Sequence, residues 1–125
     1  MLSAKVIEDF REQTEEHFHP VDGMNAGKIE EMVSYYVKAK IIENNLDVKV
    51  ENVILSGSKC RGIEKISSDL DVVVDYKGKI REDDFFNILH EEGFAIAGIA
   101  VDINPITEEK TGPLAEYLES AEQYL

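Results

Sequence analysis

The segment Asp69–Asp75 constrains the fold of this chain most, because apolar and acidic residues alternate along it. Side chains of a β-strand point alternately to the two faces of the sheet. One face of this segment therefore takes the apolar side chains of Leu70, Val72 and Val74. Asp69 and Asp71 share the opposite face. The segment predicts a strand with an apolar side that packs against the rest of the domain.

The remaining elements follow from apolar periodicity and from glycine, proline and capping residues. Their order predicts a small mixed sheet flanked by helices, an α/β (α+β) domain spanning residues 1–125, with a helical part over about 1–45 and a core over about 46–125. Helices are expected from Ser3 to near Pro20, over Asn25–Asn45, from Asp83 or Asp84 to Gly93, and from Pro113 onward. Strands are expected over Val48–Leu55, Asp69–Tyr76 and Ile96–Asn104. A turn is expected over Lys77–Lys79.

Two carboxylates on one side of a strand end repel each other unless a cation lies between them. Magnesium is the natural cation, since it prefers carboxylate and phosphate oxygens. The strand predicted over Ile96–Asn104 carries a third acid, Asp102, on the face opposite Val101 and Ile103. If this strand lies beside the strand that carries Asp69 and Asp71, Asp102 is about 5 Å from the acidic pair. Asp69, Asp71 and Asp102 then form a site for two metal ions roughly 4 Å apart, which suits phosphoryl displacement.

A loop with two glycines follows the strand predicted over Val48–Leu55. Gly57 lets backbone amides approach a phosphate closely, and the Ser58 hydroxyl can donate to a phosphate oxygen. Lys59 and Arg61 are candidates for triphosphate contact, although solvated loop side chains are an equally good interpretation. A P-loop is rejected, because the lysine and hydroxyl that should follow the second glycine are missing.

The chain carries 13 basic and 26 acidic residues, a net charge of −13, and this surface repels nucleic-acid backbones. A single nucleotide bound through metal ions is compatible with that charge. The lone cysteine, Cys60, excludes an internal disulfide and favours a reducing compartment. The longest apolar stretch, Phe94–Val101, is too short to span a bilayer. We therefore expect a cytoplasmic protein without a membrane segment.

These motifs together resemble the DNA polymerase β nucleotidyltransferase superfamily, especially its minimal nucleotidyltransferase branch. The family pattern is a hydrophobic strand, Gly-Ser, a spacer, Asp-hydrophobic-Asp and a later acid on a strand. Here Gly57-Ser58 precede Asp69-Leu70-Asp71 by ten residues, and Asp102 stands where the third acid is expected. Arg61-Gly62 and Ser68 also match the form of the minimal enzymes. Ser56 departs from it, because an aromatic residue is common before the glycine.

The resemblance implies transfer of a nucleoside monophosphate, AMP as the first choice, from a nucleoside triphosphate to a hydroxyl, with release of pyrophosphate. It assigns metal binding and catalysis to Asp69, Asp71 and Asp102, with two Mg²⁺ ions or Mn²⁺ in their place. It assigns nucleotide binding to Gly57 and Ser58. The acceptor is then a protein or a small molecule. Some minimal nucleotidyltransferases act as antitoxins on a helical partner, so a helical partner protein is a further expectation.

Two other interpretations stay open. The chain could be a non-catalytic nucleotide-binding or regulatory module within a larger protein or complex, or a structural domain whose acids are incidental. Because it starts and ends in helical patterns, a longer parent protein also stays open. His90, near the end of a predicted helix, is explained by a favourable interaction with the helix dipole.

Overall fold

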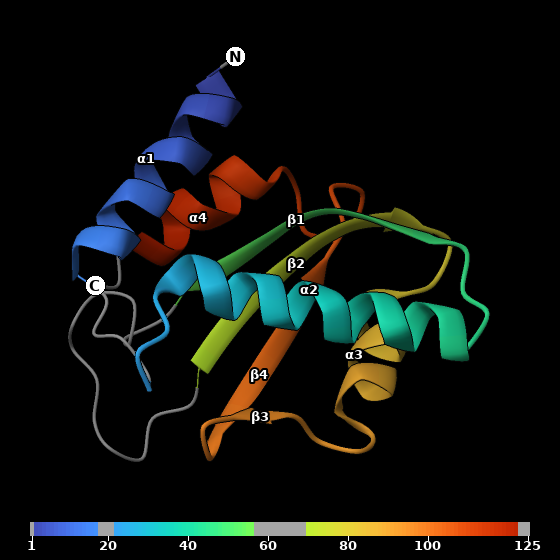
Figure 1. Cartoon of the computed structure of the whole chain (residues 1–125). Coiled ribbons are helices and arrows are strands. Elements are labelled where there is room, and N and C mark those ends of the chain that lie inside the picture. Colours follow the sequence, from blue (N-terminus) through green and yellow to red (C-terminus); the bar gives the residue numbers. More distant parts are fainter. Residues whose placement is uncertain (1, 18–21, 57–69, 123–125) are drawn as a thin grey trace.

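The computed structural model describes residues 2–17, 22–56 and 70–122 of the chain. Its elements are, in order, α1 (Leu2–His17), α2 (Ala26–Glu43), β1 (Val48–Ser56), β2 (Leu70–Gly78), α3 (Glu82–His90), β3 (Ala95–Ile96), β4 (Ile99–Ile106) and α4 (Leu114–Glu122). The strands form one sheet in the order β1-β2-β4-β3 (Figure 1). β1 and β3 run antiparallel to their neighbours, whereas β2 and β4 are parallel. The predicted mixed sheet with helices around it is therefore confirmed.

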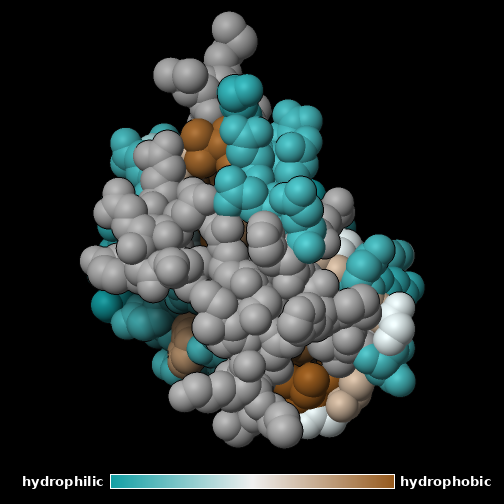
Figure 2. Space-filling model, turned by 90° about the vertical axis from the view of Figure 1, so that its left-hand side faces the viewer, coloured by the Kyte–Doolittle hydropathy of each residue, from teal (hydrophilic) through white to brown (hydrophobic). Residues whose placement is uncertain are grey.

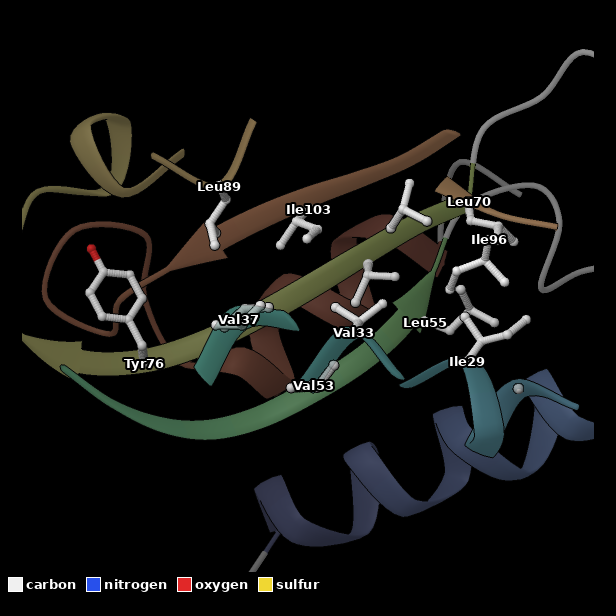
Figure 3. Close-up of a cluster of buried hydrophobic side chains, with 14 of the residues drawn as sticks. Ile29, Val33, Val37, Val53, Leu55, Leu70, Tyr76, Leu89, Ile96 and Ile103 are labelled. Atoms are coloured by element: carbon white, nitrogen blue, oxygen red, sulfur yellow. The ribbon is translucent and has the colours of Figure 1, made fainter. Parts of the chain in front are cut away.

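Helices α2 and α3 cover one face of the sheet. Ile29, Val33 and Val37 recur one turn apart along α2 and point toward the strands, where they are fully buried (Figure 3). Phe85 and Leu89 of α3 join the same cluster. The strands add alternate side chains to it: Val53, Leu55, Leu70, Val72, Val74, Tyr76, Val101 and Ile103. The alternation predicted for β2 is thus what builds this core.

Helices α1 and α4 lie beside each other and pack on the opposite face (Figure 1). Phe10 of α1 and Leu118 of α4 are buried there against Ile54, Val73 and Ile106, one from each long strand. These strand residues alternate with those of the α2 and α3 face. The second core is therefore narrow, and the strand positions around it are open to polar side chains.

The predicted limits of α2 agree with the structure to within two residues. The helix starts after Asn25, whose side-chain oxygen accepts a hydrogen bond from the Lys28 amide at 2.9 Å. Such a bond satisfies one of the free amides at a helix start. Asn44 follows the last helical residue as the C-cap. Local capping chemistry was sufficient to define this helix.

The predicted start of α3 is wrong. The helix begins at Glu82, so Asp83 and Asp84 lie in its first turn rather than at a cap. Arg81 occupies the N-cap position and makes no side-chain capping bond in the described structure. The three acids of the first turn act instead through the positive end of the helix dipole. Because acidic residues suit both the N-cap position and the first turn of a helix, the sequence alone did not distinguish the two positions.

The single strand predicted over Ile96–Asn104 is also wrong. A two-residue turn at Ala97 and Gly98 divides it into β3 and β4. Both turn residues have positive φ, 53° at Ala97 and 80° at Gly98. That geometry matches the twist of hairpin strands. The apolar residues on either side of the turn hid it from a periodicity argument.

The turn predicted over Lys77–Lys79 begins later than expected, because β2 continues through Gly78. Gly78 pairs with Val48, and a Cβ atom on it would come within 2.6 Å of the Asp47 carbonyl oxygen. No other residue tolerates so close a backbone approach. Glycine here extends the strand instead of ending it. At α4, Pro113 precedes the helix rather than opening it, and its carbonyl accepts from the Tyr117 amide.

The described residues visible in Figure 2 are mostly hydrophilic, and apolar atoms form small, separate patches on that side. Within the described ranges, no helix is both long enough and apolar enough to cross a membrane.

Candidate functional site

Two of the three predicted acids lie side by side. β2 and β4 are neighbours, and their register pairs Asp71 directly with Asp102. Paired residues of adjacent parallel strands share a face and are separated by about 4.8 Å along the hydrogen-bonding direction. This is the face of α1 and α4, opposite the larger core. The strand that carries Asp102 therefore lies beside the strand that carries Asp71, which is the condition that the predicted site required.

The other predicted site residues, Gly57, Ser58, Lys59, Arg61 and Asp69, lie outside the described residues. The elements next to them in the sequence are nevertheless defined. β1 ends at Ser56, and Ser56 pairs with Asp71 across the sheet. The backbones of Ser56, Asp71 and Asp102 thus form one row across three strands.

The local sequence explains why these acids stand where they do. Asp71 lies between Leu70 and Val72, and Asp102 lies between Val101 and Ile103; all four neighbours are buried. Burying these neighbours on the opposite face turns the carboxylates toward the α1 and α4 side. The Asp102 side chain is 49% exposed and Asp71 is partly buried. Both acids are thus held by buried strands and accessible to a ligand.

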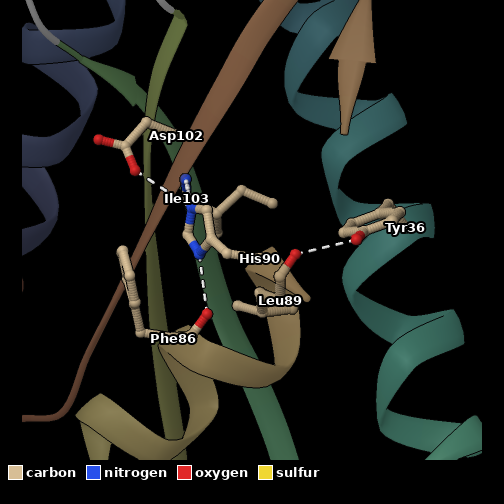
Figure 4. A network of polar contacts seen from close by, with 6 residues as sticks. All are labelled: Tyr36, Phe86, Leu89, His90, Asp102 and Ile103. Atoms are coloured by element: carbon tan, nitrogen blue, oxygen red, sulfur yellow. Dashed lines mark hydrogen bonds and ion pairs between the residues drawn. The ribbon is translucent and has the colours of Figure 1, made fainter. Parts of the chain in front are cut away.

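His90 contacts Asp102, although its place in the sequence predicts only a helix-end role. It is the last residue of α3, and its Nε2 atom lies 3.1 Å from Oδ1 of Asp102 (Figure 4). The same nitrogen lies 3.2 Å from the Ile103 amide nitrogen, and Nδ1 lies 2.8 Å from the Phe86 carbonyl oxygen. No local pattern could have revealed this, because the packing of α3 against β4 creates the contact.

Asp75 shares the face of Asp71 but has a different environment. Its register neighbours are Asn52 and Ile106, so no acid pairs with it. Oδ2 accepts a hydrogen bond from the Asn52 amide at 3.0 Å. Burial raises the pKa of the Asp75 carboxyl above its ordinary value, and the bond from Asn52 partly opposes this. Asp75 therefore has a structural partner within the sheet and is a matched comparison for Asp71.

A pocket of about 420 Å³ lies elsewhere, along the outer edge of β1 between α1 and α2. Arg11 donates to the Val53 carbonyl there at 3.1 Å, and Glu30 accepts from the Leu55 amide at 2.7 Å. These side chains satisfy backbone groups that an edge strand leaves free. These contacts account for Arg11 and Glu30 in a pocket that lies two strands away from Asp102.

The donor set for a metal ion is partial within the described residues. No group of three or more His, Cys, Asp or Glu side chains there is arranged to hold a metal. Asp71 and Asp102 provide a pair of carboxylates on one face, which suits a hard cation such as magnesium. The pair fits the predicted site, and Asp69, the third predicted ligand, precedes Leu70 at the start of β2.

No family model, curated protein or solved structure matches this chain. The arrangement of its own residues is therefore what supports a function.

Proposed function

We propose that this chain is a cytoplasmic, magnesium-dependent nucleotidyltransferase of the polymerase β type. The observation that carries the proposal is the register of β2 and β4, which pairs Asp71 with Asp102 on one face. Two ionised carboxylates so close together repel each other, and a shared cation removes that penalty. The resemblance of the motif calls for such a pair on adjacent strands.

The order of the elements supports the same proposal. The family pattern needs a hydrophobic strand before Gly57-Ser58, then a strand with the acidic pair, then a strand with the third acid. β1, β2 and β4 correspond to these in order, and β1 ends immediately before Gly57. The nucleotide-binding loop and the carboxylates would then meet at one end of the sheet.

In the proposed reaction, Asp69, Asp71 and Asp102 would hold the magnesium ions. Bound magnesium supplies positive charge to the triphosphate and lowers the barrier to displacement at phosphorus. The protein's own contribution is position, since rigid strands keep the two described carboxylates in fixed register. Gly57 and Ser58 would hold the phosphates, with Lys59 and Arg61 as further contacts. The acceptor oxygen would form a bond to the α-phosphorus as the bond to pyrophosphate breaks, and Asp102 would help to remove the hydroxyl proton, which passes to solvent.

The charge of the chain bears on the acceptor. A net charge of −13 disfavours a long nucleic acid and leaves a protein or small-molecule hydroxyl as the acceptor. ATP is the nucleotide proposed as donor. A helical protein partner is one such acceptor.

Calorimetric titration of ATP with and without magnesium tests the proposal. Wild type is expected to bind only with magnesium, and Asp71→Asn to lose more than about 100-fold in affinity, a larger effect than the loss of an outer-shell partner. Asp75→Asn is the matched control, because it removes the same charge from the same strand and face. Asp75→Asn should bind as wild type does.

Turnover is then measured with labelled ATP and candidate acceptors, following pyrophosphate release. Binding with no transfer to any acceptor would favour the non-catalytic module. No magnesium-dependent binding by folded wild type, or equal losses in the Asp71 and Asp75 variants, would refute the proposed site.

A further inference from the structure

We propose that α2 forms the interface of a homodimer, in which the helices of two copies pack antiparallel about Tyr35. The first observation is an apolar patch on the outside of this helix. Tyr35 is 68% exposed and Ile42 is 78% exposed, and the exposed Ala39 lies between them on the helix surface. Phe86 on α3, at 37%, is the only other exposed large apolar side chain among the described residues. A contiguous apolar patch of this kind marks an interaction surface.

The patch belongs to a longer stripe with the spacing of a coiled coil. Lys28, Glu31, Tyr35, Lys38 and Ile42 are all exposed and follow one another at intervals of three, four, three and four residues. This spacing keeps side chains on one side of a helix, and it is the spacing with which two helices pack along each other. We call these five residues the outer stripe. Because α2 buries its other side against the strands, the outer stripe faces away from the sheet (Figure 1).

The charges of the outer stripe favour a second copy in the antiparallel orientation. Glu31 lies four residues before Tyr35, and Lys38 lies three residues after it. With Tyr35 at the two-fold axis, Glu31 of each copy comes beside Lys38 of the other copy, because a two-fold interface repeats every contact. In a parallel pair, each of these charges would instead face its own copy and repel it. An antiparallel pair centred between Lys38 and Ala39 would also bring two Lys38 side chains together.

The same axis gives the ends of the outer stripe matching partners. Lys28 and Ile42 each lie seven residues from Tyr35, so Ile42 of one copy meets Lys28 of the other copy. A lysine covers apolar surface with its methylene groups while its ammonium group stays in water. Within one copy, Lys28 Nζ lies 3.7 Å from Oε2 of Glu31, and both side chains are about half exposed. Such an exposed ion pair contributes little, so it can rearrange when the second copy binds.

The dimer is expected to be weak, for reasons of size and charge. Residues 28–42 form about 22 Å of helix, and one helix pair of that length buries less than about 1,200 Å², the low end of specific interfaces. The net charge of −13 on each copy opposes association. Salt at about 0.15 M limits this repulsion to a range of about 8 Å. We therefore expect a dissociation constant on the order of 100 µM at that salt concentration.

Analytical ultracentrifugation of the full chain between about 10 µM and about 1 mM measures this association. Wild type should sediment as a monomer at the low end of the range and mostly as a dimer at the high end. Tyr35→Ala should raise the dissociation constant by about tenfold or more, because it removes the ring at the centre of the interface. The substituted residue is exposed, so thermal unfolding should show a fold as stable as that of wild type.

Exchange of two charges tests the orientation. Glu31→Lys and Lys38→Glu each place like charges together on both sides of the axis, and each should raise the dissociation constant by about tenfold. The double variant restores the opposite charges and should return to within about threefold of wild type. Glu12→Lys is the matched control, because it makes the same change of charge at an exposed position on α1, outside the outer stripe. It should not weaken the dimer, since it brings the net charge closer to zero.

The result decides between this interface and others. Wild type that stays monomeric at about 1 mM would overturn the homodimer and leave the outer stripe to a different protein. A dimer that Tyr35→Ala leaves unchanged would lie on another surface, and this would overturn the inference as well. Failure of the double charge variant to recover would overturn the antiparallel arrangement. None of these outcomes depends on the proposed enzyme activity, because the measurement contains no nucleotide or metal.

Discussion

The two faces of the sheet are built from the same strands and have opposite characters. On the α2 and α3 face, the strand positions from Leu70 to Tyr76 are filled by buried apolar side chains. Among the described strand residues of the α1 and α4 face, only Ile54, Val73 and Ile106 are apolar and buried, and polar side chains occupy the positions around them: Asp71, Asp75, Asp102, Asn52 and Asn104. The α2 and α3 face holds the larger apolar core, and the α1 and α4 face combines a smaller core with the carboxylates that we propose bind metal.

The contrast teaches how a small domain can hold close negative charges. Asp71 and Asp102 are paired in register, and the strands that carry them are anchored by burial on the opposite face. Leu70, Val72 and Ile103 provide that burial on the opposite face, one residue away along the backbone. The core thus fixes the positions of the acids.

The largest effect should come from the apolar face. Phe85→Ala removes a fully buried ring from the α2 and α3 side, and should lower the free energy of unfolding by about 3–5 kcal/mol. Urea unfolding measures this change. Phe86→Ala is the control, because that neighbouring ring is 37% exposed and its loss should cost about 1 kcal/mol or less. Similar losses at both positions would contradict the division between the faces.

Substitution of Asp102 on the α1 and α4 face should change ligand binding rather than the free energy of unfolding. Asp102→Asn is expected to weaken magnesium-dependent ATP binding by more than about 100-fold. Its free energy of unfolding should stay within about 1 kcal/mol of wild type, since the side chain is half exposed. Asn104→Ala, two residues further along the same face, should leave binding intact. A large loss of stability in Asp102→Asn would assign the acid to the fold instead.

Substitution of Asp75 tests whether burying a carboxylate on the α1 and α4 face lowers the free energy of unfolding. Burial raises its pKa above the ordinary 3.8, so the folded state holds the proton more tightly than the unfolded chain. This contribution to stability is full below the unfolded pKa and is lost as pH rises through the folded one. Asp75→Asn should therefore be more stable than wild type at pH 7, by at most about 1 kcal/mol because the group is partly solvated.

Urea unfolding of the wild type and the Asp75→Asn variant between pH 3 and pH 7 measures the difference. The gain should shrink toward acid. A variant less stable than wild type at neutral pH would show that the charged form is the one that the fold favours.

The smallest effect should come from a position that belongs to neither face. Ala97 has φ of 53° in the turn between β3 and β4. Ala97→Gly should stabilise the protein by about 0.5 kcal/mol, because relief of roughly 1 kcal/mol of left-handed strain exceeds the entropy cost of glycine. Ala100→Gly, within β4, should destabilise it by about 0.5–1 kcal/mol. Thermal unfolding compares the two, and the same sign for both would contradict this assignment of strain.

The sequence by itself determined what depends on neighbouring residues. The alternation along β2 predicted which side chains enter the core, and the same pattern placed Asp102 on the face away from Val101 and Ile103. The limits of α2 followed from Asn25 and Asn44. Periodicity and capping act over one or two turns, so both can be recognised in the chain alone.

Only the tertiary structure decided the register that pairs Asp71 with Asp102 and the contact from His90 to Asp102. These residues lie on separate elements, and their approach depends on how α3 and β4 pack together. The turn at Ala97 and Gly98 also escaped prediction, because apolar residues continue through it. Long-range packing has no periodicity, so the strand pattern could place each acid on a face but could not say which residues would meet there.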